Sequence, residues 1–401
     1  MKRKHSILAG LLLLTISSFG QDYIELAKQA WANKKYYDVI DYANKSLNVS
    51  SSGSAYWYRG IARYELQNYS EALPDFKSAI VYYSDYSSLG KLYYWAAYCK
   101  YVLKDYKGAI SDFESSKNYG YEDKTNLYWY LGSANRNIAE YQKAAEAYTT
   151  AIGYTVDNST LSNLYQLRGD ARYELFKNND AISDYIKAIE YNSNNSNAFW
   201  ARAIARAANF QYDLAIGDFT SAINIIEREN KAGRENDLSI LYSNRGLYQY
   251  YLVKYDEAKA DLQKSLDLNP NYDKANRNMG DVLYALKKYK EANPYYLRAV
   301  SLVKDDADRA SCYSSLYWSC RYMLDYTQAL TYLNSAIKIN PNIHNYYRNR
   351  AYLQAVKKNY SASLDDYNKA IELYSKDTSS LISLYSDRAQ LKIKMKNKNE
   401  K

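Results

Sequence analysis

The chain has 401 residues, of which 53 are Lys or Arg and 44 are Asp or Glu, and its formal net charge is +9. This small basic excess, spread over a long sequence, argues against a nucleic-acid partner, because nucleic-acid binders usually gather Lys and Arg on one face. With three cysteines and two histidines, the chain can build neither a disulfide framework nor a histidine-based metal or catalytic site, so we expect no metal, no cofactor and no enzymatic activity.

The amino terminus has the three parts of a secretory signal. Residues 1–5 are basic, residues 6–16 are almost entirely apolar, and residues 17–20 are mostly small and offer a cleavage site before Gln21. The apolar run is shorter than the roughly 20 residues of a membrane-spanning helix, and no later segment reaches that length. We therefore expect an exported protein, periplasmic or secreted, without a membrane span after signal cleavage. An uncleaved signal would instead tether the protein to a membrane.

A small residue recurs through the rest of the chain at intervals of 33 to 43 residues, which is typical of stacked helical hairpins. This reference position holds, in chain order, Ala27, Gly60, Ala97, Gly132, Gly169, Ala203, Gly246, Gly280, Tyr317 and Ala351. The positions 12 and 19 residues later are also mostly small, and the position 16 residues later is usually large and apolar or aromatic. Because steps of four and three residues share one helical face, these three positions predict a packing face on a second helix.

In these positions the chain resembles the tetratricopeptide repeats, and Asn269-Pro270 and Asn340-Pro341 match the proline that closes a repeat in that family. The resemblance implies an all-α fold, a right-handed superhelical solenoid of antiparallel helix hairpins. The longest interval contains a charged stretch with Gly233, which we expect to form a soft joint or protruding loop. The expected segments are a signal peptide at 1–20, six repeats at 22–226, the charged insertion at 227–237, four repeats at 238–376, a capping helix at 377–395 and a basic tail at 396–401.

Five repeats carry Arg directly before the reference position and Asp fifteen residues after it. These are Arg59 with Asp75, Arg168 with Asp184, Arg202 with Asp218, Arg245 with Asp261, and Arg350 with Asp366. Where the first position is apolar the second lacks an acid, as in Leu131 with Ala147, and only Ala96 with Asp112 departs from this rule. The two positions vary together, which predicts a bidentate ion pair across each hairpin. Ligand-binding arginines would leave the matched aspartates unexplained.

The resemblance also implies a concave groove lined by the first helices. The residues three before, one after and four after each reference position should point into it, because these offsets form one helical stripe. The aromatic members of this set, which we call the aromatic stripe, are Trp31, Trp57, Tyr64, Tyr94, Tyr98, Tyr101, Trp129, Tyr173, Trp200, Tyr250, Tyr284, Trp318 and Tyr352. The stripe holds five of the six tryptophans, so composition alone does not account for it.

Tyr and Trp dominate the hot spots of protein interfaces, so we expect the aromatic stripe to bind a protein or peptide partner. Two alternatives remain open at this point. The rings could stack on sugars, as in a glycan or cell-wall binding module, or they could only fill the seam between adjacent first helices. The favoured interpretation is an exported, non-enzymatic interaction scaffold.

Overall fold

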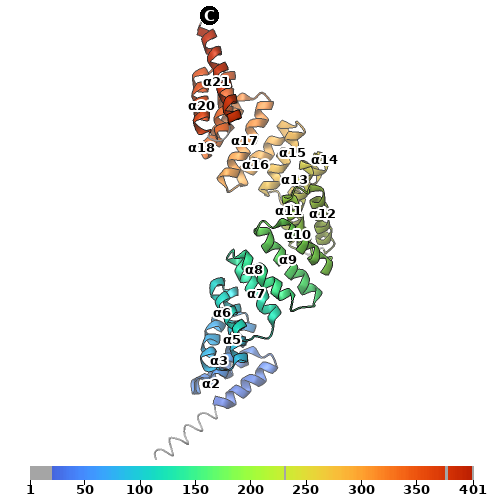
Figure 1. Cartoon of the computed structure of the whole chain (residues 1–401), viewed down its shortest axis with the longest axis vertical. Helices are drawn as coiled ribbons and strands as arrows, with labels where there is room; N and C mark the ends of the chain where they lie inside the picture. Colours follow the sequence, from blue (N-terminus) through green and yellow to red (C-terminus); the bar gives the residue numbers. More distant parts are fainter. Residues whose placement is uncertain (1–19, 230–231, 375–377, 400–401) are drawn as a thin grey trace, which may run out of the picture. The chain divides into compact units, whose positions relative to one another are not determined.

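The computed structural model describes residues 20–229, 232–374 and 378–399, and all regular secondary structure in these ranges is helical (Figure 1). The predicted signal, apart from Gly20, lies outside the described residues. None of the described helices combines the length and the apolar composition that a membrane crossing needs. The all-α prediction is therefore confirmed for the part of the chain that the structure describes.

The described chain forms two compact units, Met1–Ala205 and Arg206–Lys401, which we treat separately. The first contains a helix at residues 20–32, followed by α2 (Tyr36–Val49), α3 (Gly53–Glu65), α4 (Tyr69–Tyr82), α5 (Tyr86–Val102), α6 (Tyr106–Asn118), α7 (Lys124–Asn137), α8 (Tyr141–Ile152), α9 (Asn158–Glu174), α10 (Asn178–Tyr191) and most of α11 (Ser196–Ala208).

The second unit continues from the end of α11. It contains α12 (Tyr212–Glu229), α13 (Glu235–Tyr251), α14 (Tyr255–Leu268), α15 (Asp273–Ala285), α16 (Tyr289–Leu302), α17 (Asp306–Tyr322), α18 (Tyr326–Ile339), α19 (His344–Val356), α20 (Tyr360–Leu373) and α21 (Thr378–Asn399). Within each unit, most helices pack against the helices before and after them in the chain, as a hairpin solenoid requires.

A left-handed residue ends the first helix of every predicted repeat. It lies seven residues after the reference position, at Lys34, Gln67, Lys104, Ala139, Phe176, Phe210, Val253, Lys287, Leu324 and Lys358, with φ between 55° and 64°. In the second repeat, Gln67 N donates to Tyr64 O and Asn68 N donates to Arg63 O, both at 2.8 Å. These bonds satisfy carbonyl groups that the helix end would leave free, so the chain can reverse within a few residues.

The reference position is small because a ring from the second helix lies against it. A Cβ atom added to Gly132 would lie 2.8 Å from the Tyr148 ring, and one added to Gly280 would lie 2.6 Å from the Tyr296 ring. The exception, Tyr317, is fully buried in a cluster with Leu333, which replaces the ring sixteen residues later. A large residue at the reference position is therefore accompanied by a smaller one sixteen residues later.

The charged insertion at 227–237 mainly lengthens helices. Its first three residues complete α12, its last three begin α13 at Glu235, and Gly233, shortly before α13, has φ 87°. The compact units divide earlier, between Ala205 and Arg206 inside α11.

Candidate functional site

Four of the predicted Arg–Asp pairs form bidentate ion pairs across their hairpins. In each pair, Nε and Nη2 of the arginine donate to the carboxylate oxygens over 2.6 to 3.1 Å, at Arg59 with Asp75, Arg168 with Asp184, Arg245 with Asp261, and Arg350 with Asp366. The aspartate side chains are only 3 to 8% exposed. Arg202 and Asp218 belong to different compact units, and their pairing stays a prediction.

Each of these arginines also contacts a neighbouring repeat. Arg245 lies over the Tyr242 ring, 5.3 Å from its centroid, and its Nη1 donates to Thr220 Oγ1 at 3.0 Å. Equivalent bonds join Arg59 to Asn44, Arg168 to Thr149, and Arg350 to Asn334. The arginines are thus occupied within the solenoid, which favours the structural interpretation over five ligand-binding groups.

A second cation on the same aspartate escaped the sequence analysis. Arg63 and Arg172, three residues after their reference positions, donate to Asp75 and Asp184 at 2.7 and 2.8 Å. Lys100 occupies the same position and pairs with Asp112 at 2.6 Å. This cation explains why Asp112 is present although Ala96 replaces the usual arginine.

The rings of the aromatic stripe near the amino terminus pack mainly against other aromatic side chains of the same unit. Tyr64 contacts Trp95 and Tyr98 at centroid distances of 4.5 and 5.4 Å, and Tyr98 and Tyr101 both contact Tyr130. Trp31 contacts Tyr36, Trp57 contacts Phe76, and Trp129 packs against the cluster around Tyr148. These contacts are those of a packing seam.

Tyr94 requires a correction, because it does not face a groove. Its side chain is 5% exposed, and its ring stacks on Tyr121 at 4.3 Å and meets Phe113 at 5.8 Å. Burial raises the pKa of its hydroxyl. The helical offset placed Tyr94 on the stripe, but the connection after α6 carries Tyr121 over its ring and excludes a ligand.

Two later members of the stripe line a cavity of about 670 Å³ in the first unit, which we call the first-unit cavity. Tyr173 from α9 and Trp200 from α11 are both half-buried there. Asp170 also lines the cavity, accepts a hydrogen bond from the Tyr185 hydroxyl at 3.0 Å, and lies 3.5 Å from Arg136 Nη1 of α7. Burial raises the pKa of Asp170, although the bond from Tyr185 and the charge of Arg136 oppose the rise.

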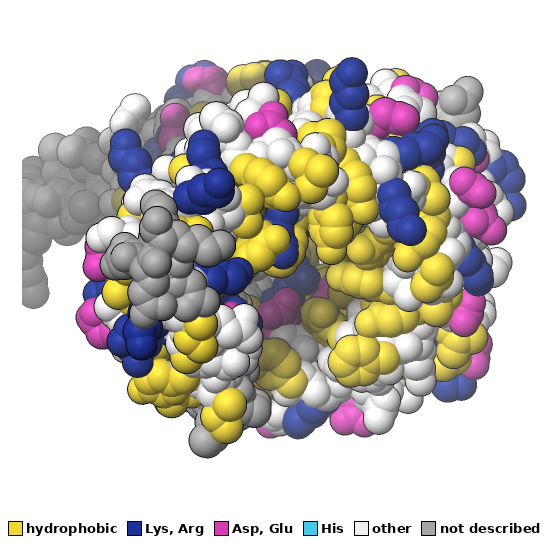
Figure 2. All heavy atoms as spheres, turned by 90° about the horizontal axis from the view of Figure 1, so that it is seen from above, with side chains coloured by type: hydrophobic (Ala, Val, Ile, Leu, Met, Phe, Trp, Pro, Cys, Tyr) yellow, Lys and Arg dark blue, Asp and Glu magenta, His cyan; other side chains and the backbone are white. Residues whose placement is uncertain are grey.

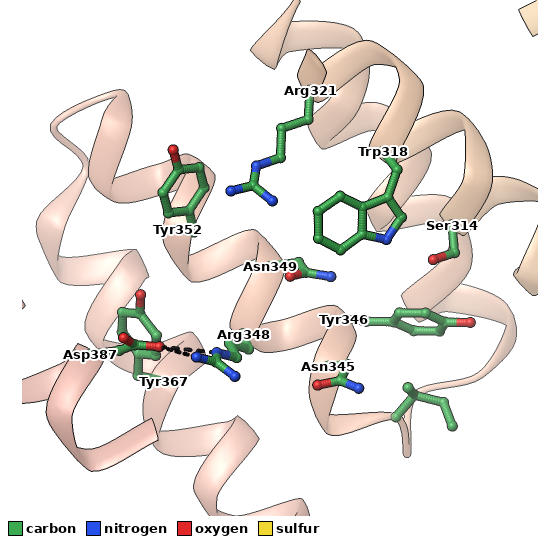
Figure 3. A pocket seen from close by; sticks show the side chains of 11 residues that line it. Ser314, Trp318, Arg321, Asn345, Tyr346, Arg348, Asn349, Tyr352, Tyr367 and Asp387 are labelled. Atoms are coloured by element: carbon green, nitrogen blue, oxygen red, sulfur yellow. Dashed lines mark hydrogen bonds and ion pairs between the residues drawn. The ribbon is translucent and has the colours of Figure 1, made fainter. Parts of the chain in front are cut away.

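Trp318 and Tyr352 line a second cavity, of about 550 Å³, in the second unit (Figure 3), which we call the second-unit cavity. The Arg321 guanidinium lies between these rings, 4.9 Å from the Trp318 centroid and 4.4 Å from the Tyr352 centroid. Asn345, Tyr346 and Asn349 of α19 also line the cavity.

The capping helix α21 completes the opposite wall of the second-unit cavity. Asp387 accepts from Arg348 Nε at 3.0 Å and from its Nη2 at 2.8 Å, and Ser383 Oγ accepts from Nη2 at 2.7 Å. This contact shows that α21 supplies side chains to the cavity as well as covering the end of the solenoid.

The remaining stripe residues, Tyr250 and Tyr284, are half-buried among other tyrosines. Tyr250 contacts Tyr251 and Tyr255, and Tyr284 contacts Tyr289 and Tyr322 at 5.3 and 5.8 Å.

Among the residues that the structure describes, no cluster of three or more His, Cys, Asp or Glu side chains could hold a metal ion. On the face seen in Figure 2, basic and acidic side chains are interspersed with hydrophobic ones.

The sequence analysis assigned no role to one arginine in each cavity, Arg136 in the first and Arg321 in the second. Arg136 and Arg321 share the position four after the reference, which holds tyrosine at Tyr64, Tyr101, Tyr173, Tyr250 and Tyr284. An arginine at a position that holds tyrosine in five other repeats was the signal in the sequence. The aromatic stripe does not include it, because the stripe is defined by aromatic residues alone. Asn349 of α19 and Asp387 of α21 share another repeat position. Each lies two residues before a small residue, Ala351 or Ala389.

Comparisons with known proteins identify the repeats. Family models described as tetratricopeptide repeat match residues 240–272, 273–342 and 321–378. A solved structure, the C-terminal part of a TPR repeat-containing protein from Cytophaga hutchinsonii, has a TM-score of 0.54 at 19% identity and covers 64% of this chain and 99% of that structure. The matched segment therefore consists of tetratricopeptide repeats, and the structural likeness shows the same fold.

Curated relatives match parts of the chain. The Hsp70-Hsp90 organizing protein of Triticum aestivum is 23% identical over 256 residues, which cover 60% of this chain and 39% of that protein. The small glutamine-rich tetratricopeptide repeat-containing protein 2 of Saccharomyces cerevisiae is 29% identical over 103 residues, 26% of this chain and 27% of that protein. The chain thus spans less than half the length of either relative.

Proposed function

We propose that this tetratricopeptide-repeat chain is an exported, non-enzymatic scaffold that binds a protein or peptide partner along its aromatic stripe. The observation that carries the proposal is the pair of cavities, each lined by stripe residues from the first helices of consecutive repeats. Each combines accessible stripe rings, of which Tyr352 is 40% exposed, with a few charged and amide groups, the composition expected of a site with apolar anchors and polar orientation.

The stripe is not equally suited to binding over its whole length. Tyr64, Tyr98 and Tyr101 are engaged with one another and with Tyr130, so they serve packing. The binding residues in this proposal are Tyr173 and Trp200 in the first unit and Trp318 and Tyr352 in the second. The relatives named as organizing proteins of Hsp70 and Hsp90 are consistent with protein partners for such repeats, although those chaperones are partners of the relatives.

A glycan ligand is the second candidate, and the first-unit cavity favours it. Asn197, Gln166 and Asp170 line this cavity together with the half-buried Trp200, and planar polar groups beside an accessible ring suit a sugar. The Trp318 ring is less suitable for sugar stacking because Arg321 already lies over it.

The test is capture of binding partners from an envelope extract on the immobilised protein, repeated after enzymatic removal of glycans. We expect the captured material to be protein and to survive glycan digestion. Loss of all capture after digestion would favour the glycan module. Export is tested by intact mass, which should correspond to a chain that begins at Gln21; retention of Met1 in the cellular protein would contradict cleavage.

A further inference from the structure

We propose that one edge of the second unit docks on an anionic membrane surface, such as a bilayer that contains phosphatidylglycerol. This edge, which we call the terminal edge, comprises residues 323–325, residues 356–359 and residues 391–396 of α21. None of these residues lines the second-unit cavity. The terminal edge is therefore a second surface, and its docking does not depend on the partner binding proposed above.

The capping helix α21 brings its carboxyl end to the same edge as the turns of the preceding repeats. Arg388 of α21 lies over the ring three residues earlier and donates to Asn368 at 2.8 Å, and Arg350 of α19 makes equivalent contacts. The helix thus takes the place of the first helix of another repeat. Residues 391–396 then correspond to the end of α19 and its turn, and α21 continues past them to Asn399. Figure 1 shows its carboxyl end extending beyond α20.

The terminal edge exposes large apolar side chains. Leu324 and Ile393 are 69 and 60% exposed, and Val356 is also exposed. Leu324 has φ 63°, a conformation that glycine would adopt without cost, so an exposed leucine there benefits neither the backbone nor the core. In the connection between α16 and α17, at the opposite ends of the helices, Val303 is instead buried. Exposed apolar groups beside polar ones are typical of a surface that another molecule covers.

The packing of α21 fixes the orientation of its exposed side chains. Leu391 and Met395, one turn apart, pack against the hydrophobic cluster that contains Leu333. Ile393 lies halfway between them in sequence and therefore points to the opposite face of the helix. This face is presented to solvent without any change in the fold.

Lysines surround these apolar groups. They are Lys357, Lys358, Lys392, Lys394 and Lys396, and all five are exposed. The one acid among the residues of the terminal edge is Asp325, whose carboxylate accepts from Gln328 N at 3.0 Å and caps α18. The terminal edge therefore has an excess of positive charge. Each lysine near an anionic lipid surface strengthens binding about fivefold.

A membrane fits this surface better than a second copy of the chain or a nucleic acid does. Two terminal edges would bring their lysines together, so like charges would repel. A nucleic acid would attract the lysines through its phosphates, but it would leave Leu324 and Ile393 without apolar partners. An anionic bilayer supplies both contacts, because its head groups attract lysine and its acyl boundary takes up apolar side chains. A fluid lipid surface also adapts to separate protrusions.

The test is co-sedimentation of the full chain with lipid vesicles. One set of vesicles is pure phosphatidylcholine, and the other contains equal parts of phosphatidylcholine and phosphatidylglycerol. Residues 1–20 are the same in every variant, so differences between variants report the terminal edge. We expect the wild type to bind the anionic vesicles at least about tenfold better than the neutral ones. Added salt should weaken the binding, because it screens exposed charges.

The lysines are tested by combining Lys358→Gln, Lys392→Gln and Lys394→Gln, which should lower the affinity for anionic vesicles about a hundredfold. The matched control combines Lys274→Gln, Lys304→Gln and Lys338→Gln, at three exposed positions of the same unit outside the terminal edge. The control changes the net charge equally and should leave the affinity nearly unchanged.

The apolar contact is tested by Ile393→Gln, with Ile382→Gln as its control. Ile382 lies near the other end of α21 and is 64% exposed, so the two variants remove equally accessible side chains from one helix. Ile393→Gln should weaken binding to the anionic vesicles at least about fivefold, and Ile382→Gln should not. Circular dichroism melting verifies that each variant is folded.

Four results would overturn the proposal. They are equal binding of the wild type to both kinds of vesicle, equal affinities of the two triple variants, equal affinities of Ile393→Gln and Ile382→Gln, and no vesicle binding at all. In the last case, binding to double-stranded DNA that the first lysine triple abolishes would assign the edge to a nucleic acid. A dimer in analytical ultracentrifugation that Ile393→Gln dissociates would assign it to a second copy of the chain.

Discussion

Arg245 illustrates how single residues stabilise this solenoid. Its guanidinium binds both oxygens of Asp261, reaches Thr220 of the preceding repeat, and lies over the Tyr242 ring. The hydrogen bond and charge of Asp261 raise the pKa of Arg245 even though burial, the largest single influence, acts to lower it. The pair is therefore maintained as an ion pair in a partly desolvated site.

We predict that Arg245→Leu destabilises the fold more than the double change Arg245→Leu with Asp261→Ala. The single change leaves Asp261 buried without a cation, which costs about 3 to 5 kcal/mol, whereas the double change imitates Leu131 and Ala147 of another repeat. Thermal melting of the two variants provides the comparison. Equal melting temperatures would show that the pairing carries no such cost.

Val253 is a residue whose local conformation opposes stability. It has φ 62° at the turn after α13, its side chain is 65% exposed, and a β-branched residue is unfavourable in this region. Val253→Gly should raise stability by about 1 kcal/mol, because glycine adopts the left-handed conformation without steric cost. Leu297→Gly, at a partly exposed site inside α16, should lower stability by about as much. Chemical denaturation measures the free energy of unfolding of both variants. A lower value for Val253→Gly than for the wild type would refute the strain argument.

At the scale of the helix and hairpin, the sequence predicts the packing positions well. Gly132 and Tyr148 could be paired in advance because both positions recur in register along the chain. Tyr94 was misplaced because its cover comes from Tyr121, in a connection that follows no repeat rule. The Arg321 stack was missed because it depends on Tyr352 in the next repeat, and periodicity within one repeat does not reveal such a neighbour.

The capping helix α21 provides a direct test at this scale. Leu384 is 1% exposed and belongs to the terminal hydrophobic cluster, whereas Ile382, two residues earlier, is 64% exposed. Leu384→Ala should cost about 2 to 5 kcal/mol, because it opens a cavity in that cluster. Ile382→Ala should change stability by less than about 0.5 kcal/mol. Similar unfolding midpoints for both variants would contradict the packing of α21 as a cap.

At the scale of the whole molecule, the sequence predicts the solenoid, and the structure shows which aromatic rings line cavities. The repeat pattern predicts the hairpin solenoid because each repeat must bury its apolar face on the next one. The pattern does not predict which rings remain available, since that depends on contacts between neighbouring first helices. Only the structure separates the seam around Tyr98 from the cavities beside Trp200 and Trp318. Export and the identity of the partner stay predictions.

The central claim, that stripe residues bind a partner, is tested most directly by Trp200→Ala, with Phe113→Ala as the matched control. Trp200 is half-buried in the first-unit cavity, while Phe113 is fully buried between helices. A hot-spot ring contributes about 2 kcal/mol or more to binding, which is about thirtyfold in affinity, whereas loss of a core ring costs folding about 3 to 5 kcal/mol.

The measurement is partner capture together with the melting temperature of each variant. The account predicts that Trp200→Ala melts within about 4 °C of the wild type and captures its partner about thirtyfold less well, while Phe113→Ala loses stability first. If Trp200→Ala instead unfolds the chain, and capture follows only the folded fraction, then the stripe is a packing seam and the binding claim is wrong.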